Sequence, residues 1–140
     1  MELNAAMALH KEAERLCRDL DGAMALHKEE ESSCRELGHK DGLSVSLGNQ
    51  ALILIDRGKL DGTVALFKEQ ERLCREFGNL NGLSISLANQ ALLLSEAHGR
   101  RREARRLADE ALAIATRHGY PQLVPRILSI RDSIPMNAER

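Results

Sequence analysis

Hydrophobic and polar positions follow the period of an α-helix along most of the chain. Between 60 and 77 one mostly apolar stripe recurs at the spacing i, i+1, i+4, i+7, i+8 and i+11: Leu66, Phe67, Gln70, Leu73, Cys74 and Phe77. The positions off the stripe carry charge: Lys68, Glu69, Glu71, Arg72, Arg75 and Glu76. This pattern predicts an amphipathic helix with one face against the rest of the protein.

A second kind of segment is apolar on more than one side. Between 43 and 57, Leu43, Leu47, Ala51 and Leu54 form one stripe, while Val45, Leu52 and Ile55 occupy another sector. Such a helix is expected to lie between neighbours. We therefore expect units that pair an inner, enclosed helix with an outer, amphipathic one. The predicted helices, about seven in all, span 3–18, 22–37, 42–57, 60–77, 82–97, 100–118 and 121–133.

The chain repeats itself at a period of 40 residues. Shifted by 40, Leu20-Asp21-Gly22 falls on Leu60-Asp61-Gly62, Cys34-Arg35-Glu36 on Cys74-Arg75-Glu76, and Asn49-Gln50-Ala51-Leu52 on Asn89-Gln90-Ala91-Leu92. A degraded third copy follows at a shift of 41, with Gly58 on Gly99 and Gly78 on Gly119. A fixed period of this length is typical of stacked repeats. We expect a single domain over 1–140, with repeats at about 1–40, 41–80 and 81–120 and a capping helix at about 121–133.

Glycines recur at corresponding places in the units. The sets are Gly22 and Gly62; Gly38, Gly78 and Gly119; Gly42 and Gly82; and Gly58 and Gly99. They predict joints where a helix ends or a short turn reverses the chain. Gly48 instead interrupts a helical stretch, and its partner one period later is Ala88. A small residue is needed there for close packing or for access of a ligand to the backbone.

The segment LGNQALILIDRGKLDGTVALFKEQERLC, at 47–74, resembles a tetratricopeptide repeat, in particular the longer variant of about 40–42 residues found in kinesin-light-chain-like arrays. The resemblance places Leu47, Ala51 and Leu54 on the first helix of the repeat and Gly58 between the helices. It implies an all-α fold, a right-handed α-solenoid of helix–turn–helix repeats.

The first unit departs from the pattern of this family. Lys11 and Glu14 stand where small and large apolar residues are expected, and the letters MALHKE occur at both 7–12 and 24–29. The segment 3–18 thus looks like a copy of an outer helix. The first unit is interpreted as a truncated or rearranged remnant.

Asn49 and Asn89 are the sharpest functional candidates. Each lies on a predicted inner helix, one sector away from its apolar stripe, where the side chain is expected to reach the concave surface. The resemblance implies that such an asparagine donates to and accepts from the backbone of a bound extended peptide, which an amide can do. The alternative is a hydrogen bond that only joins neighbouring units.

The residues beside the asparagines are expected to form the wall of a peptide-binding groove. They are Val45, Gly48, Leu52 and Ile55 with Asp56, and Ile85, Ala88, Leu92 and Ser95 with Glu96. The aliphatic side chains offer apolar contacts, and the carboxylates of Asp56 and Glu96 favour a ligand with a basic residue. The alternative is burial against a neighbouring helix. No Lys or Arg recurs beside the asparagines, which argues against a carboxylate clamp.

Composition and motifs narrow the function classes. The 20 basic and 21 acidic residues give a net charge of −1, and aromatic residues make up 2%. Nucleic acid is therefore not an expected partner, and the arginines of 100–106 are interpreted as a solvated face. Cys17, Cys34 and Cys74 are interpreted as core residues, and the five histidines have no metal-ligand spacing. We find no catalytic or phosphate-binding motif. An enzyme, a metal and a cofactor are not expected.

The sequence predicts a protein-interaction module. The alternative is a structural repeat that self-associates and forms a homodimer. A short array exposes two unlike ends, which favours such association. It could also be part of a larger signalling protein. The chain has no evident targeting or membrane-spanning segment, no CxxC pair and an odd number of cysteines, so a cytoplasmic location is expected.

Overall fold

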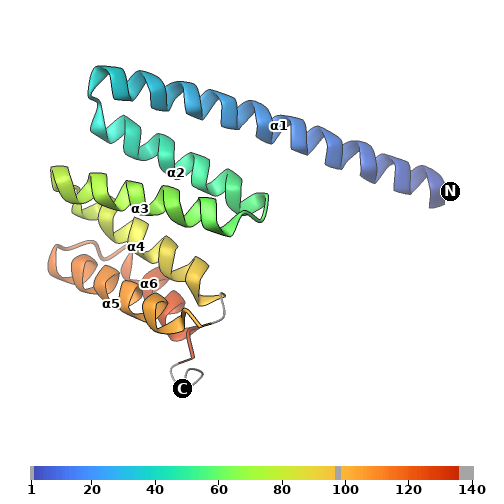
Figure 1. Cartoon of the computed structure of the whole chain (residues 1–140). Coiled ribbons are helices and arrows are strands. Elements are labelled where there is room, and N and C mark those ends of the chain that lie inside the picture. Colours follow the sequence, from blue (N-terminus) through green and yellow to red (C-terminus); the bar gives the residue numbers. More distant parts are fainter. Residues whose placement is uncertain (1, 97–98, 136–140) are drawn as a thin grey trace.

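The structure, a computed structural model, describes residues 2–96 and 99–135. The described residues form six helices and no strand: α1 (Glu2–Leu37), α2 (Lys40–Asp56), α3 (Leu60–Phe77), α4 (Leu80–Ser95), α5 (Arg101–Arg117) and α6 (Val124–Asp132). Consecutive helices pack against one another, and α4 also contacts α6. Figure 1 shows α1 to α5 stacked in chain order, with α6 beside α4 and α5. The all-α prediction is confirmed.

Left-handed glycines turn the chain between these helices. Gly38, Gly58, Gly78, Gly99 and Gly119 have φ values between 68° and 77°. No other described residue has a positive φ, because a side chain is strained in this region. The predicted joints at these five glycines are therefore confirmed. Gly22 and Gly62 lie inside α1 and α3 and mark no joint.

Two further glycines make room for the caps of the inner helices. The Gly42 amide donates to His39 Nδ1 over 2.8 Å, and the Gly82 amide donates to Asn79 Oδ1 over 2.9 Å. A Cβ at either glycine would lie about 2.5 to 2.6 Å from the capping side chain. Glycine at these two positions thus allows a side chain to cap the N-terminus of α2 and of α4.

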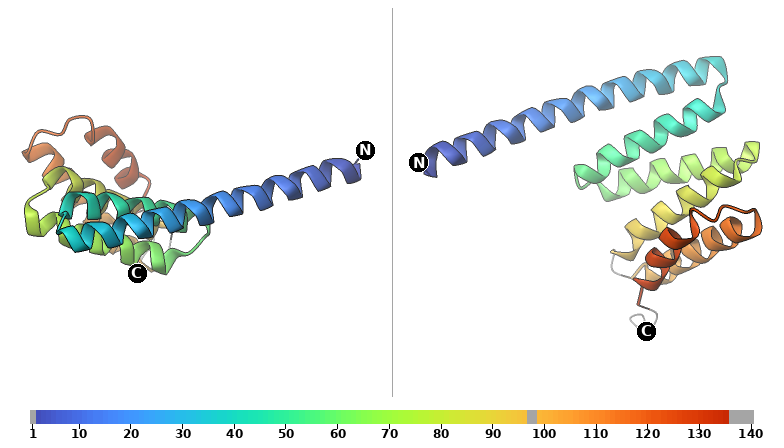
Figure 2. Two further views of the ribbon diagram at one scale, coloured as in Figure 1. Left: turned by 90° about the horizontal axis from the view of Figure 1, so that it is seen from above. Right: turned by 180° about the vertical axis from the view of Figure 1, so that it is seen from behind.

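The predicted break between 3–18 and 22–37 is wrong, because α1 is one helix of 36 residues. The glycine that turns the chain before α3 is Gly58, and the residue 40 positions earlier is Arg18. An arginine is strained in the left-handed conformation, so the helix continues through this point. The structure therefore has six helices in its described residues where about seven were predicted, and the first unit is not a helix pair. The N-terminal half of α1 projects beyond α2 (Figures 1 and 2).

The core is aliphatic and is densest around α4. Leu83, Leu87, Ala91 and Leu94 of this helix are at most 4% exposed, as are four alanines on one stripe of α5: Ala104, Ala108, Ala111 and Ala115. Ile127 and Ile130 of α6 close the C-terminal end. Around α2, the buried Leu43 and Leu47 pack with Leu73 of α3. This confirms the first predicted stripe of the inner helices.

Candidate functional site

Buried polar side chains join each inner helix to the outer helix before it. Ser46 Oγ donates to the His27 carbonyl oxygen over 2.6 Å, and Ser86 Oγ, one period later, donates to the Phe67 carbonyl oxygen over 2.9 Å. Both serines are at most 1% exposed. The recurrence of serine at this spacing therefore has a structural cause, since an unpaired buried hydroxyl would be costly.

A second recurring network links three consecutive helices at each joint. Gln50 Nε2 donates to Glu31 over 2.8 Å, while Arg35 donates both to Glu31 and to Glu69 of α3. The hydrogen bond from Gln50, together with Arg35, lowers the pKa of Glu31, and the two carboxylates raise the pKa of Arg35. The same pattern recurs one period later among Gln90, Glu71, Arg75 and Glu110.

These networks were not predicted from the sequence, although the residues that form them recur at the period of the repeat. The serine, glutamine, glutamate and arginine each recur at a spacing of 40, as Asn49 and Asn89 do. Recurrence alone therefore cannot separate a residue that binds a ligand from one that joins repeats. Burial and hydrogen-bond partners separate them.

The second apolar sector of the inner helices lies at the surface. We call Val45, Asn49, Leu52, Ile85, Asn89 and Leu92, which lie on α2 and α4, the inner-helix surface. Val45, Leu52 and Leu92 are 61%, 54% and 41% exposed, and Ile85 is half-buried. Burial against a neighbouring helix, the alternative interpretation, does not describe the three exposed side chains. Aliphatic side chains exposed in a row are available to a partner.

The two asparagines have different surroundings. Both are half-buried, but Asn89 Oδ1 accepts a hydrogen bond from Arg126 Nη2 of α6 over 3.0 Å. Asn89 thus joins two helices in the way the alternative interpretation describes. The Asn49 side chain makes no hydrogen bond to the described residues, and it is the available amide of the pair. Arg126 also places a cation beside Asn89, where the sequence suggested none.

Gly48 allows the side chain of Gln70 to pack closely against the backbone of α2. A Cβ at this position would lie about 2.7 Å from Nε2 of Gln70, a side chain of α3 that donates to the Ser44 carbonyl oxygen over 2.9 Å. The glycine therefore makes room for the Gln70 amide. Ala88, its counterpart, is 4% exposed and faces no glutamine, because Ala111 stands at the position of Gln70 in the next unit.

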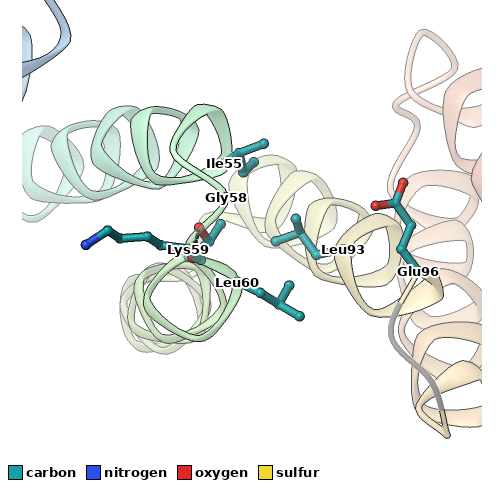
Figure 3. Close-up of a pocket in the computed structure, with 7 residues that line it drawn as sticks. Ile55, Gly58, Lys59, Leu60, Leu93 and Glu96 are labelled. Carbon is teal, nitrogen blue, oxygen red and sulfur yellow. Dashed lines mark hydrogen bonds between the residues drawn. The ribbon is translucent and has the colours of Figure 1, made fainter. Parts of the chain in front are cut away.

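An open hollow lies where the C-terminal ends of α2 and α4 meet the start of α3. It has a volume of about 310 Å³ and is lined by Ile55, Gly58, Lys59, Leu60, Thr63, Leu93 and Glu96. Figure 3 shows Ile55, Leu60 and Leu93 coming from three different helices, with Glu96 at the end of α4. Leu60 and Leu93 were not among the predicted site residues. Asp56, the other predicted acidic residue, has a side chain outside the described part of the structure.

The remaining candidates have structural roles. Arg105 donates to the carbonyl oxygens of Arg131 and Ile134, and Arg100 pairs with Glu103. Cys74 is fully buried, burial raises the pKa of its thiol, and Ser44 contacts its sulfur. Among the described residues, no group of His, Cys, Asp or Glu side chains is arranged to hold a metal ion. No helix in this part of the chain has an apolar stretch long enough to cross a bilayer.

In comparisons with known proteins, neither a family model nor a curated protein matches this sequence.

Proposed function

We propose that the protein is a non-catalytic interaction module that binds an extended peptide of a partner protein on the inner-helix surface. The observation that carries the proposal is the exposure of Val45, Leu52 and Leu92 at 41% to 61% on helices whose other faces are buried. These side chains add nothing to the core, and exposing them to water has a cost. A partner that covers these side chains would remove them from water and so gain binding free energy.

The chemistry of this surface suits an extended backbone. The Asn49 amide can donate to a peptide carbonyl and accept from a peptide N–H. Val45 and Leu52 flank it on the same helix and can contact side chains of the peptide. The hollow is lined by aliphatic side chains together with Lys59, Thr63 and Glu96. It suits an aliphatic side chain of the peptide, and the Glu96 carboxylate is available to a basic residue next to it.

The same proposal includes the kind of array. The 40-residue period, the left-handed glycines and the alternation of enclosed and amphipathic helices fit a tetratricopeptide-like solenoid with a right-handed superhelix. Such a module would act as a scaffold in the cytoplasm. A crystal structure of the full chain tests the handedness of the superhelix.

A selection experiment tests the peptide site. Random linear peptides displayed on phage are selected on the immobilised full chain, and the strongest binder is synthesised and titrated. We expect Asn49→Ala to weaken its binding at least about tenfold, which corresponds to about 1.4 kcal/mol. Asn81→Ala, an exposed asparagine in the first turn of α4, is the matched control. Equal affinity of both variants and the parent chain would reject the role of Asn49.

Self-association is the second candidate function. The specific observation in its favour is the N-terminal half of α1, which lies outside the helix stack (Figure 1).

A further inference from the structure

The same turn precedes both inner helices, but the side chain that caps the helix differs. The turn before α2 reads GHKDG, at 38–42, and the turn before α4, one period later, reads GNLNG, at 78–82. The backbone of the capping residue is nearly identical in the two turns. Its φ and ψ angles are −85° and 88° at His39 and −81° and 84° at Asn79. In both turns its amide donates over 2.9 Å to a carbonyl oxygen of the preceding outer helix. The repeat thus contains one joint twice, with two different caps.

The cap of α2 depends on the protonation state of an imidazole. His39 Nδ1 accepts a hydrogen bond from the Gly42 amide over 2.8 Å, so this nitrogen carries no proton. A protonated imidazole has an N–H on both ring nitrogens and cannot accept this bond. Its positive charge would also lie at the positive end of the helix dipole. In the other turn, Asn79 Oδ1 accepts from the Gly82 amide over 2.9 Å, and an amide oxygen does not titrate.

The surroundings of His39 leave its ring open to protonation. The residue is exposed. The titratable and charged residues at this corner are Cys34, Arg35 and Glu36 of α1, Lys40 and Asp41 of α2, and Cys74, Arg75 and Glu76 of α3. Several of these charges are already paired, Arg35 with Glu69 and Glu76 with Arg72 among them. Within the described part of the chain the His39 ring forms no ion pair, so a protonated ring has no carboxylate that would offset the lost hydrogen bond.

We propose that His39 makes the joint between α1 and α2 sensitive to pH. As the pH falls from about 7.5 to about 5.5, the imidazole gains a proton, the Gly42 amide loses its cap and the first turn of α2 loosens. The contribution of the cap to stability is thus present at neutral pH and lost on acidification. The joint between α3 and α4 keeps its cap over the same range. The cap is a property of the chain alone, so the proposal does not depend on a bound peptide.

The amide signals of two glycines test the proposal within one molecule. The ¹⁵N-labelled full chain is titrated between about pH 7.5 and about 5.5 and followed by NMR. We expect the Gly42 amide proton to move upfield as its hydrogen bond is lost, in step with the ring protons of His39. The Gly82 amide is expected to stay in place. Equal movement of the two amides, or a Gly42 amide that does not follow His39, would overturn the proposal.

Hydrogen exchange shows whether the loosening is local. The Leu43 amide donates to the His39 carbonyl oxygen over 3.0 Å, and the Leu83 amide donates to the Asn79 carbonyl oxygen over 2.9 Å. Since the loss of a cap changes the opening equilibrium about fivefold, we expect the protection factor of Leu43 to fall by this amount on acidification. That of Leu83 is expected to remain constant. A loss of protection shared by both leucines would reject a local switch.

A variant with the cap of the other joint tests the effect on stability. His39→Asn puts the side chain of Asn79 at the start of α2. On acidification over the same range, we expect the unfolding constant of the parent chain to rise about fivefold more than that of His39→Asn, as measured by urea denaturation. His118→Asn removes an exposed histidine at the C-terminal end of α5 and is the matched control, which keeps the acid loss. Equal pH dependence of the parent and His39→Asn would overturn the proposal. So would a parent that gains stability in acid relative to His39→Asn, because Asp41 would then hold the protonated ring.

Discussion

At the scale of single residues, the glycine φ angles decide where this chain turns. The five left-handed glycines sit at the ends of helices, and a Cβ added at any of them would meet no atom within 4 Å. Glycine is therefore needed at these positions for the positive φ angle, and not to avoid a clash between a Cβ and a neighbouring atom. Gly22 also has open space around it but lies inside α1, where glycine is a poor helix former.

Substitution by alanine is expected to change the stability of the fold in opposite directions at Gly58 and at Gly22. Gly58→Ala forces a side chain into the left-handed region and is expected to destabilise the fold by about 1–2 kcal/mol. Gly22→Ala is expected to stabilise it by about 0.8–1 kcal/mol if α1 is continuous. Urea denaturation of both variants measures the two effects. Destabilisation by Gly22→Ala would mean that α1 bends at this residue.

The neighbouring polar residues Asn89 and Gln90 are expected to differ in their contribution to stability. Gln90 is 1% exposed and donates to Glu71, so Gln90→Ala leaves a carboxylate without its buried partner. We expect a loss of about 1–3 kcal/mol. Asn89→Ala, at a half-buried position, is expected to cost less than about 1 kcal/mol. Thermal unfolding of the two variants compares them directly, and equal losses would contradict this division of roles.

The pH dependence of stability reports on Glu31. Gln50 and Arg35 hold its folded pKa below the ordinary value of 4.5. Its ionised form therefore stabilises the fold above pH 4.5, and this contribution is lost as the pH falls through the lowered pKa. We expect the stability difference between the parent chain and Glu31→Gln to be largest near neutral pH and to shrink below pH 4.5. Urea titrations over this range test the sign, and a difference that grows on acidification would refute it.

At the scale of the elements, small residues determine how closely helices approach. The four buried alanines of α5 form a stripe at i, i+4, i+7 and i+11 that packs against α4. Close contact between helices requires side chains of this size along the whole stripe. The core of this protein is correspondingly poor in aromatic side chains, and Phe67 is its largest fully buried residue.

Enlarging one alanine of the stripe is expected to separate α4 and α5. Ala108→Leu is expected to destabilise the protein by about 1–3 kcal/mol, because the added methylenes have no space. Ala113→Leu, on the exposed side of the same helix, keeps the helix propensity similar and is the control. Chemical denaturation distinguishes them. Equal stability of the two variants would show that the α4–α5 contact is looser than described.

Most helices could be predicted from the sequence, because their periodicity and their joints agree. The predicted span 60–77 matches α3, and 42–57 differs from α2 by two residues at the start and one at the end. Recurrence wrongly predicted a break before Gly22, although Gly22 and its counterpart Gly62 both lie inside helices. The informative comparison is between Gly58, which turns the chain, and Arg18, which stands 40 positions earlier.

The candidate site was less predictable, because its contacts depend on packing between distant segments. The exposed sector of α2 followed from its second apolar stripe. The bond between Arg126 and Asn89 joins residues 37 positions apart and depends on how α6 packs on the array. Leu60 and Leu93 meet Ile55 only at the junction of three helices (Figure 3). No local pattern in the sequence indicates either arrangement.

At the scale of the whole molecule, two kinds of apolar surface remain outside the core. The inner-helix surface is built from repeated positions, and its Asn49 amide is available for a peptide backbone. The second surface runs along α1, where Leu16 and Leu26 are 52% and 53% exposed. We assign the first surface to a partner peptide.

Locating a bound peptide on the isotope-labelled full chain tests directly whether the inner-helix surface is the peptide site. The selected peptide is titrated while backbone and asparagine side-chain amide shifts are followed by NMR. We expect the largest shifts at Asn49, Leu52 and Leu92, with small changes along the outer helices α3 and α5. Shifts that gather on α3 and α5, with the amide of Asn49 unmoved, would contradict it.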